Sequence, residues 1–181
     1  MHRVMNSIRS LGDKQQNLLA LLLGALVVAA FAPLSFSVLA VLGLLGFFSL
    51  IPYEQPRRAA WRGFFFGLGM FGVGTSWVVV SIHEFGHSPL PLAVFMTLLM
   101  VAYLALFPAL FAWAMARGKV NKHPLRFVVL APALWVATEW LRGTLFTGFP
   151  WLNIGYSQMD TWLAAYAPVL GIYGLGALVV L

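Results

Sequence analysis

The stretch LAVFMTLLMVAYLALFPALFAWAMA, from Leu92 to Ala116, carries no charged side chain and decides the fold class. A helix needs about 20 apolar residues to cross the hydrocarbon core of a bilayer, and this stretch is longer than that. The whole chain of 181 residues is 61% hydrophobic and 9% charged, and its mean hydropathy is +0.89. A soluble domain with this composition would aggregate. We therefore predict an integral membrane protein.

Further apolar segments flank this one, so we predict an all-α integral membrane bundle of about six transmembrane helices. The six segments are centred near Ala25, Leu42, Met70, Leu99, Leu134 and Leu170. The first two are short and joined tightly around Pro33, and the third is expected to be one helix over about 61–82. The fifth is expected over about 126–146. The sixth opens near Trp162 and is still apolar at Leu181, so we expect a chain that is truncated inside a span.

The net charge of +6 is better explained by orientation in a membrane than by nucleic-acid binding, and no nucleic-acid partner is expected. The basic residues that lie between the apolar segments are Arg3, Arg9, Lys14, Arg57, Arg58, Arg62, Arg117, Lys119, Lys122 and Arg126. Cytoplasmic loops of membrane proteins are rich in Lys and Arg. We therefore predict that residues 1–17 form a cytoplasmic N-terminal segment and residues 18–181 the transmembrane domain. The loops 83–89 and 147–160 then face the periplasm.

A possible zinc motif, H-E-x-x-H, is formed by His83, Glu84 and His87. On a helix this spacing places two imidazoles on one face, with the glutamate as a base. Pro89 and Pro91 follow directly and oppose helix geometry there, and the chain offers no suitable third ligand. An intramembrane zinc protease is therefore a minor alternative, and we expect no metal or other cofactor. The chain also contains no cysteine, which excludes a disulfide or a thiol nucleophile among these residues.

Two other patterns are interpreted as structural. The glycines Gly67, Gly69, Gly72 and Gly74 lie inside an apolar segment without a preceding strand, so they predict close helix packing and not a phosphate-binding loop. The aromatic residues Tyr53, Trp61, Trp113 and Trp162 lie near the expected helix ends and are interpreted as anchors at the membrane interface. Glu54 is expected to form a surface ion pair with Arg57 and Arg58.

An acid and a base stand out in the stretch WVATEWLRGTLFTGFPWLNIGYSQMD, from Trp135 to Asp160. Glu139 and Arg142 are three residues apart, so they share one face of a helix and can pair. Ionisable groups within an apolar segment are costly unless they have a partner or a function. The sequence leaves open whether this is a structural ion pair or a functional one.

The second half of this stretch is predicted to be an outward-facing loop. Gly148 and Pro150 end the helix. Phe149, Trp151 and Tyr156 then supply amphipathic rings of the kind found at the level of lipid headgroups. We predict that this loop binds lipid.

Three segments of the chain together resemble a known family. They are TEWLRGTLFTGFPWLNIGYSQ (Thr138 to Gln158), FAPLSFSVLAVLGLLGF (Phe31 to Phe47) and GFFFGLGMFGVGTSWVVVSI (Gly63 to Ile82). The resemblance is to the N-terminal membrane portion of apolipoprotein N-acyltransferase, and it covers nearly all of the chain from about Phe31 to Leu181. GFPWLNIGYSQ is the most specific of these matches.

The resemblance implies an acyltransferase of lipoprotein biosynthesis, multi-pass in the bacterial cell inner membrane, with its active-site side in the periplasm. In that family a phospholipid donates an acyl chain to a cysteine thiol, and the α-amino group of a diacylated apolipoprotein attacks the thioester. The catalytic Glu, Lys and Cys belong to a nitrilase-like α/β domain. Because this chain has no cysteine, we expect that domain to be absent and the chain to be inactive alone, with no catalytic residue in it.

The resemblance also implies which residues bind substrate. They are Trp151, Phe149, Pro150, Gly148, Glu139, Arg142, Tyr156 and Gln158. Trp151 is the expected lipid contact, and residues 148–150 would shape the loop around it. Glu139 and Arg142 would stiffen the helix beneath the loop or meet a headgroup, while Tyr156 and Gln158 would dock the catalytic domain or hydrogen-bond substrate. A lipid-binding membrane scaffold without catalysis remains the main alternative.

Overall fold

The computed structural model describes residues 12–118 and 124–181, which form helices and no strand within those ranges. The helices are α2 (Asp13–Val28), α3 (Val38–Leu50), α4 (Pro56–Gly74), α5 (Trp77–Val80), η1 (Ser81–Phe85), α6 (Leu90–Arg117), α7 (Pro124–Thr144) and α8 (Ala167–Val180). Three short helices, η3 (Leu145–Thr147), η4 (Ile154–Gln158) and η5 (Trp162–Tyr166), lie between α7 and α8. The all-helical prediction is confirmed for these residues. Residues 1–11 of the predicted N-terminal segment lie outside the described ranges.

Within the described part of the chain, two helical segments are long and apolar enough to cross a membrane. They are Leu90–Arg117 and Trp162–Val180, and the bent pair Pro56–Gly74 and Trp77–Phe85 makes a third if it counts as one span. The short helices α2 and α3, of 16 and 13 residues, follow the prediction of two short segments joined near Pro33. The prediction of helices able to cross a membrane is therefore confirmed, and the number of six spans stays a prediction.

The third apolar segment is broken, so the prediction of one helix over 61–82 was wrong. The helix ends at Gly74, resumes at Trp77, and the two parts are bent by 52°. Thr75 Oγ1 donates to the Phe71 carbonyl at 2.7 Å, and Val78 N donates to the Thr75 carbonyl at 3.0 Å. Hydroxyl side chains that bond the preceding turn commonly bend helices. The break leaves the Gly74 carbonyl available to another part of the fold.

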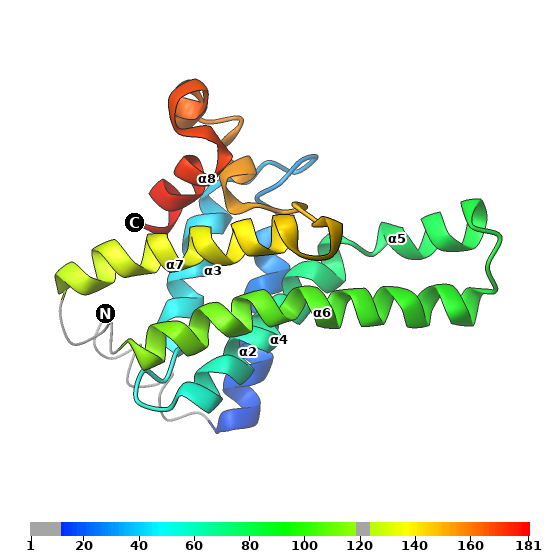
Figure 1. The fold of residues 1–181 in the computed structure, drawn as a ribbon, viewed down its shortest axis with the longest axis horizontal. Helices are drawn as coiled ribbons and strands as arrows, with labels where there is room; N and C mark the ends of the chain where they lie inside the picture. Colours follow the sequence, from blue (N-terminus) through cyan, green and yellow to red (C-terminus); the bar gives the residue numbers. More distant parts are fainter. Residues whose placement is uncertain (1–11, 119–123) are drawn as a thin grey trace.

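Helix α4 packs closely between α2 and α6, which lie on either side of it (Figure 1). A Cβ atom at Gly67 would lie 2.6 Å from Ala105 Cα on α6, and one at Gly69 would lie 2.9 Å from Ala25 N on α2. The prediction of close helix packing is confirmed at these two glycines.

The packing prediction was wrong for Gly72, where the nearest atom to an added Cβ is Val101 Cγ1 at 4.0 Å. Gly74 is tightly packed, but its neighbour is the side chain of Leu152 in the loop after α7. The four glycines therefore serve different surfaces, because successive helical positions point in different directions.

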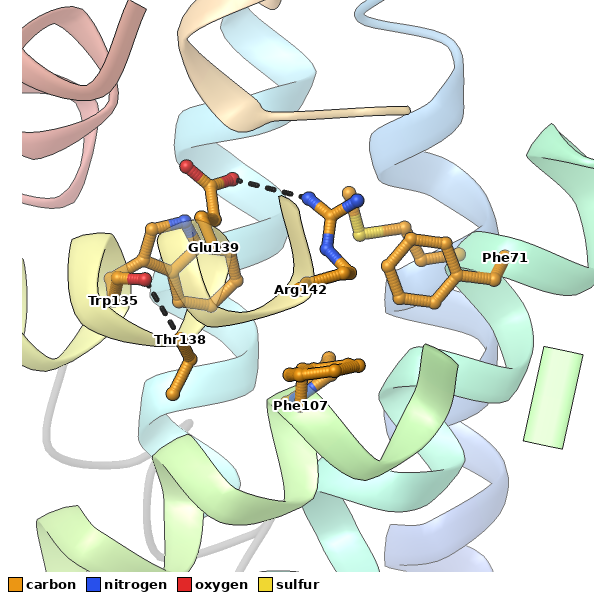
Figure 2. A pocket seen from close by; sticks show the side chains of 8 residues that line it. Phe71, Phe107, Trp135, Thr138, Glu139 and Arg142 are labelled. Atoms are coloured by element: carbon orange, nitrogen blue, oxygen red, sulfur yellow. Dashed lines mark hydrogen bonds and ion pairs between the residues drawn. The ribbon is translucent and has the colours of Figure 1, made fainter. Parts of the chain in front are cut away.

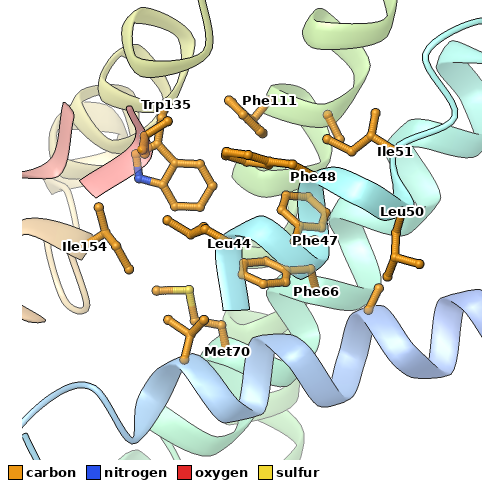
Figure 3. Close-up of a cluster of buried hydrophobic side chains, with 14 of the residues drawn as sticks. Leu44, Phe47, Phe48, Leu50, Ile51, Phe66, Met70, Phe111, Trp135 and Ile154 are labelled. Atoms are coloured by element: carbon orange, nitrogen blue, oxygen red, sulfur yellow. The ribbon is translucent and has the colours of Figure 1, made fainter. Parts of the chain in front are cut away.

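Aromatic rings fill the space where α3, α4, α6 and α7 meet (Figure 3). Phe47 stacks on Phe66 with ring centroids 4.2 Å apart, and Phe111 meets Trp135 edge to face at 5.0 Å. Phe48 contacts both Phe111 and Trp135. Such aromatic pairs contribute roughly 0.5–1.5 kcal/mol each beyond the burial of their area. This cluster fixes α7, and with it the residues of the candidate site, against the rest of the bundle.

Helix α5, η1 and the first half of α6 stand clear of the other helices (Figure 1). We call residues 77–99 the arm. Large apolar side chains are exposed along it, among them Trp77, Val80, Phe85, Leu92, Phe95 and Leu99. An exposed apolar surface of this extent indicates contact with lipid or with another protein surface.

The packing of α4 predicts opposite effects of the same substitution at two glycines. Gly67→Ala would push α4 away from the α6 backbone, and we expect a loss of about 1–3 kcal/mol in stability. Gly72→Ala meets no close neighbour and should be neutral or stabilising by about 0.5–1 kcal/mol, because alanine favours a helix over glycine. Thermal midpoints of the two variants in the same detergent measure this difference. Equal midpoints would contradict the packing described for Gly67.

Candidate functional site

Arg142, near the end of α7, is enclosed by the loop that follows its helix. The residue is only 2% exposed. Nη1 donates to the Phe149 carbonyl at 2.7 Å and to the Trp151 carbonyl at 2.5 Å, and Nη2 donates to Asn153 Oδ1 at 2.5 Å. The Phe149 amide in turn donates to the Arg142 carbonyl at 2.9 Å. A guanidinium offers five donors in a rigid fork, so one side chain can fix several turns of a loop.

Glu139, one turn earlier on α7, holds the next part of the same loop. The residue is 4% exposed, and its Oε1 accepts from the Ile154 amide at 2.7 Å. Oε1 also lies 4.0 Å from Arg142 Nη2, a loose ion pair. Within the described residues, Glu139 Oε2 and the Trp135 indole nitrogen are buried without a hydrogen-bond partner. The two charged residues thus pair only weakly with each other, and both bind the loop.

A small cavity lies beneath Arg142 and Glu139, between α4, α6 and α7 (Figure 2). The Arg142 guanidinium carbon is 5.1 Å from the centre of the Phe71 ring, a distance typical of a cation–π contact. The cavity has a volume of about 20 Å³, which is room for about one water molecule. An acyl chain does not fit in this cavity.

The backbone of the loop is strained where it leaves α7. Phe146, Thr147 and Leu152 have φ angles of +49°, +75° and +58°, in the region that side chains other than glycine rarely adopt. Each such residue costs about 1–3 kcal/mol and persists only where its surroundings hold it. Gly148 has φ of +78°, and a side chain there would collide with the Gly143 backbone. The hydrogen bonds that Arg142 and Glu139 make with the loop stabilise this strained conformation.

Trp151 is fixed at the surface by the helix break in α4. Its indole nitrogen donates to the free Gly74 carbonyl at 3.1 Å. Its ring meets Trp77 at 5.5 Å between centroids and Phe149 at 6.5 Å. Trp151 is nevertheless 48% exposed. An aromatic ring that is held in place yet about half exposed therefore lies next to Trp77, at the base of the arm.

The remaining predicted site residues divide between surface and interior. Pro150 and Tyr156 are exposed, and Phe149 is half-buried. Gln158 is buried, where its Nε2 donates to Ser157 Oγ at 2.9 Å and to the Ser37 carbonyl at 3.4 Å. It connects η4 to the start of α3. The structure thus gathers all eight residues into one loop and its support, with only part of them accessible.

Sequence reasoning missed three groups that the site uses. Asn153 is 1% exposed and accepts a hydrogen bond from Arg142. The Phe71 ring makes a cation–π contact with Arg142, and the Gly74 carbonyl accepts a hydrogen bond from Trp151. Asn153 was visible as an amide in an apolar stretch and could have been found. The Gly74 carbonyl carried no such signal, because its availability depends on the break in α4.

The H-E-x-x-H motif does not form the helical face that zinc binding requires. Helix η1 ends at Phe85, and His87 lies beyond it with φ of +48°. His83 Nδ1 lies 2.7 Å from the Ser88 carbonyl, which engages one ring nitrogen. No group of three possible metal ligands occurs in the ranges that the structure describes. The local geometry therefore gives no support to the protease alternative.

The hydrogen bonds of Arg142 predict that its replacement by lysine releases the loop. A lysine at this position keeps the charge but cannot reach both carbonyls and Asn153, so amide hydrogen exchange at 149 and 154 should accelerate on the order of tenfold or more. Arg117→Lys, at the exposed end of α6, is the matched control and should leave these amides unchanged. Unaltered exchange at both amides in Arg142→Lys would show that other contacts hold the loop.

Comparison with known proteins agrees with the resemblance described for the sequence. A family model for the apolipoprotein N-acyltransferase N-terminal domain matches residues 23–181. A protein named apolipoprotein N-acyltransferase from Methylococcus capsulatus is 50% identical over 159 residues, covering 88% of this chain and 32% of the relative. Proteins of the same name from Vibrio cholerae and Nitrosomonas europaea are 43% and 46% identical over 168 residues, with 93% and 90% of this chain covered.

The chain spans about a third of the length of these relatives, since the matches cover 32%, 33% and 33% of them. The family model nevertheless matches from within α2 through the whole of α8, and the matched range includes the loop held by Arg142. The chain belongs to the apolipoprotein N-acyltransferase family, of which it matches the N-terminal domain.

Proposed function

We propose that this chain is the membrane module of a lipoprotein N-acyltransferase and that its loop 148–154 positions the phospholipid acyl donor. The observation that carries the proposal is Trp151, whose ring is held by Gly74 and Trp77 while half of it stays exposed at the base of the apolar arm. A rigid aromatic surface binds an apolar chain at low entropic cost, because little freedom is lost on binding. The acceptor in this proposal is a diacylated apolipoprotein.

In this proposal the buried residues act by positioning. Arg142 and Glu139 hold the loop through its carbonyls and the Ile154 amide, and they contact substrate only through it. Phe149 and Pro150 flank the Trp151 ring, and Tyr156, exposed on η4, offers a hydroxyl to a headgroup or to the catalytic domain. Gln158 acts by fixing η4.

The proposal assigns the thioester chemistry to residues outside this sequence. The family resemblance implies a cysteine nucleophile, and the chain contains no cysteine. The chain alone is accordingly proposed to be inactive, and its contribution is to hold the donor in the bilayer next to a catalytic domain.

Orientation belongs to the proposal as well. The starts of α2 and α4 lie together, since Asp13 contacts Arg58 at 3.5 Å and Arg62 at 2.8 Å, and α6 ends with Arg117. By the positive-inside rule this basic end faces the cytoplasm of a bacterial inner membrane. About six membrane-crossing passes, with residues 18–181 as the transmembrane domain, then place loop 148–154 on the periplasmic side.

The proposed function is tested with a hybrid enzyme. Residues 23–181 of this chain replace the matched third of the Methylococcus capsulatus relative, and acyl transfer from phospholipid to a diacylated lipopeptide is measured. We expect an active hybrid, because this chain supplies the same module. A hybrid that is inserted and folded but inactive, beside an active parent, would contradict the proposed function and favour the scaffold alternative.

The role of Trp151 is tested within the same hybrid. We expect Trp151→Ala to lower kcat/KM for the phospholipid donor about tenfold, the factor for a loss of roughly 1.4 kcal/mol of contact. Trp140→Ala, an equal change at an exposed tryptophan on α7, is the matched control and should stay within about twofold. If both variants keep full activity while the hybrid is active, the loop assignment is wrong and the acyltransferase assignment stands.

A further inference from the structure

A second surface of the molecule, at the opposite end from loop 148–154, has the shape and charge of a lipid site. It is a shallow groove of about 450 Å³ between α4 and α6. Its lining comprises Arg57, Ala60, Trp61, Phe64, Leu106, Ala109 and Trp113. We call it the basic-end groove. None of these residues belongs to the site proposed for the acyl donor.

The groove exists because small residues form its floor and large ones its walls. Gly63 approaches the backbone of Pro108 and Ala109, so α4 and α6 are in close contact beneath the floor. Ala60 and Ala109 add little bulk above that contact, whereas Trp61 and Trp113 rise from the two helices and are exposed. The result is a shallow, mainly apolar channel with an indole ring on each of the two helices.

The two helices run in opposite directions here, which brings their basic ends together. Gly63 meets Ala109 and Gly67 meets Ala105, so positions that rise along α4 meet positions that fall along α6. Arg57 precedes Trp61 by four residues, and Arg117 follows Trp113 by four, so each arginine lies one turn beyond a tryptophan on the same helix face. Both arginines are exposed. The channel is thus lined by one cationic side chain, Arg57, and Arg117 lies one turn beyond its Trp113 wall.

Arg57 differs from its basic neighbours in having no competing acid. Asp13 engages Arg58 at 3.5 Å and Arg62 at 2.8 Å. Arg57 makes no ion pair among residues 12–118 and 124–181, and the predicted pair of Glu54 with Arg57 and Arg58 does not form there. Arg57 is therefore available to a ligand, whereas Arg58 is occupied.

We propose that the basic-end groove binds one anionic phospholipid, with its phosphate at Arg57 and one acyl chain over Ala60 between Trp61 and Trp113. Charge complementarity selects this occupant, because the mouth of the groove is cationic and its channel is apolar. The phospholipid lies in the leaflet at the basic end of the bundle, which makes it distinct from the acyl donor proposed for loop 148–154. This site is independent of acyl transfer.

The test is lipid retention by the purified 181-residue chain, read by native mass spectrometry. The chain in detergent is incubated with equal amounts of phosphatidylglycerol and phosphatidylethanolamine that carry the same acyl chains. We expect selective retention of one phosphatidylglycerol. Arg57→Gln should reduce its retention about fivefold, the effect of one basic residue near a lipid phosphate. Arg58→Gln changes the charge equally at an occupied arginine and should retain the lipid.

A second variant tests the channel. Ala60→Leu fills the floor and should reduce retention of both phospholipids, while the thermal midpoint confirms that the chain stays folded. If Arg57→Gln and Arg58→Gln lowered phosphatidylglycerol retention equally, net charge alone would explain the effect, and the proposal would be overturned. Equal retention of the two phospholipids by the unaltered chain, or full retention by folded Ala60→Leu, would also overturn it. Because no acyl transfer is measured, failure here leaves the proposed function untouched.

Discussion

The candidate site depends on the need to neutralise one buried guanidinium. Arg142 lies in an apolar helix, where an unpaired charge would cost several kcal/mol. Glu139 alone does not satisfy it, since their closest atoms are 4.0 Å apart. The loop therefore returns over the helix end and offers two carbonyls and the Asn153 side chain. The positive φ angles at Phe146, Thr147 and Leu152 are the conformational cost of that return.

At the opposite end of the bundle, a buried arginine again binds several parts of the chain. Arg62 on α4 is buried, and it donates to Asp13 Oδ1 at 2.8 Å, to Gln16 Oε1 and to the Leu50 carbonyl at 3.5 Å. It thereby joins the start of α2 to the end of α3, which are both short helices. Between these two arginines the helices are held by the aromatic cluster and by the glycine contacts of α4 (Figure 3). Directional bonds fix the ends of the bundle, and packing fixes its middle.

The features that could be predicted from the sequence are those that depend on composition and side-chain type. The apolar segments, the closeness of Glu139 to Arg142 and the loop after α7 were all predictable. The break at Thr75 was not, because the apolar segment continues through it and the bend comes from hydroxyl groups bonding the backbone. The partners of Arg142 and Trp151 were hidden for a related reason, since most are backbone carbonyls, which every residue has. Gly67 and Gly72 also look alike in sequence, and only the position of α6 distinguishes them.

The exposure of Trp151 supports the proposed donor site over a purely structural role for this residue. A tryptophan that served only to close the junction of α4 and α7 would gain most by burying its whole ring, as Trp135 does in the aromatic cluster. Trp151 instead has its indole nitrogen satisfied by the Gly74 carbonyl and its ring in contact with Trp77, while about half of the residue stays exposed. Its orientation is thus fixed before any ligand arrives. A ring that is both held in place and accessible loses little entropy on binding an acyl chain, and the proposed donor role of this loop depends on that combination.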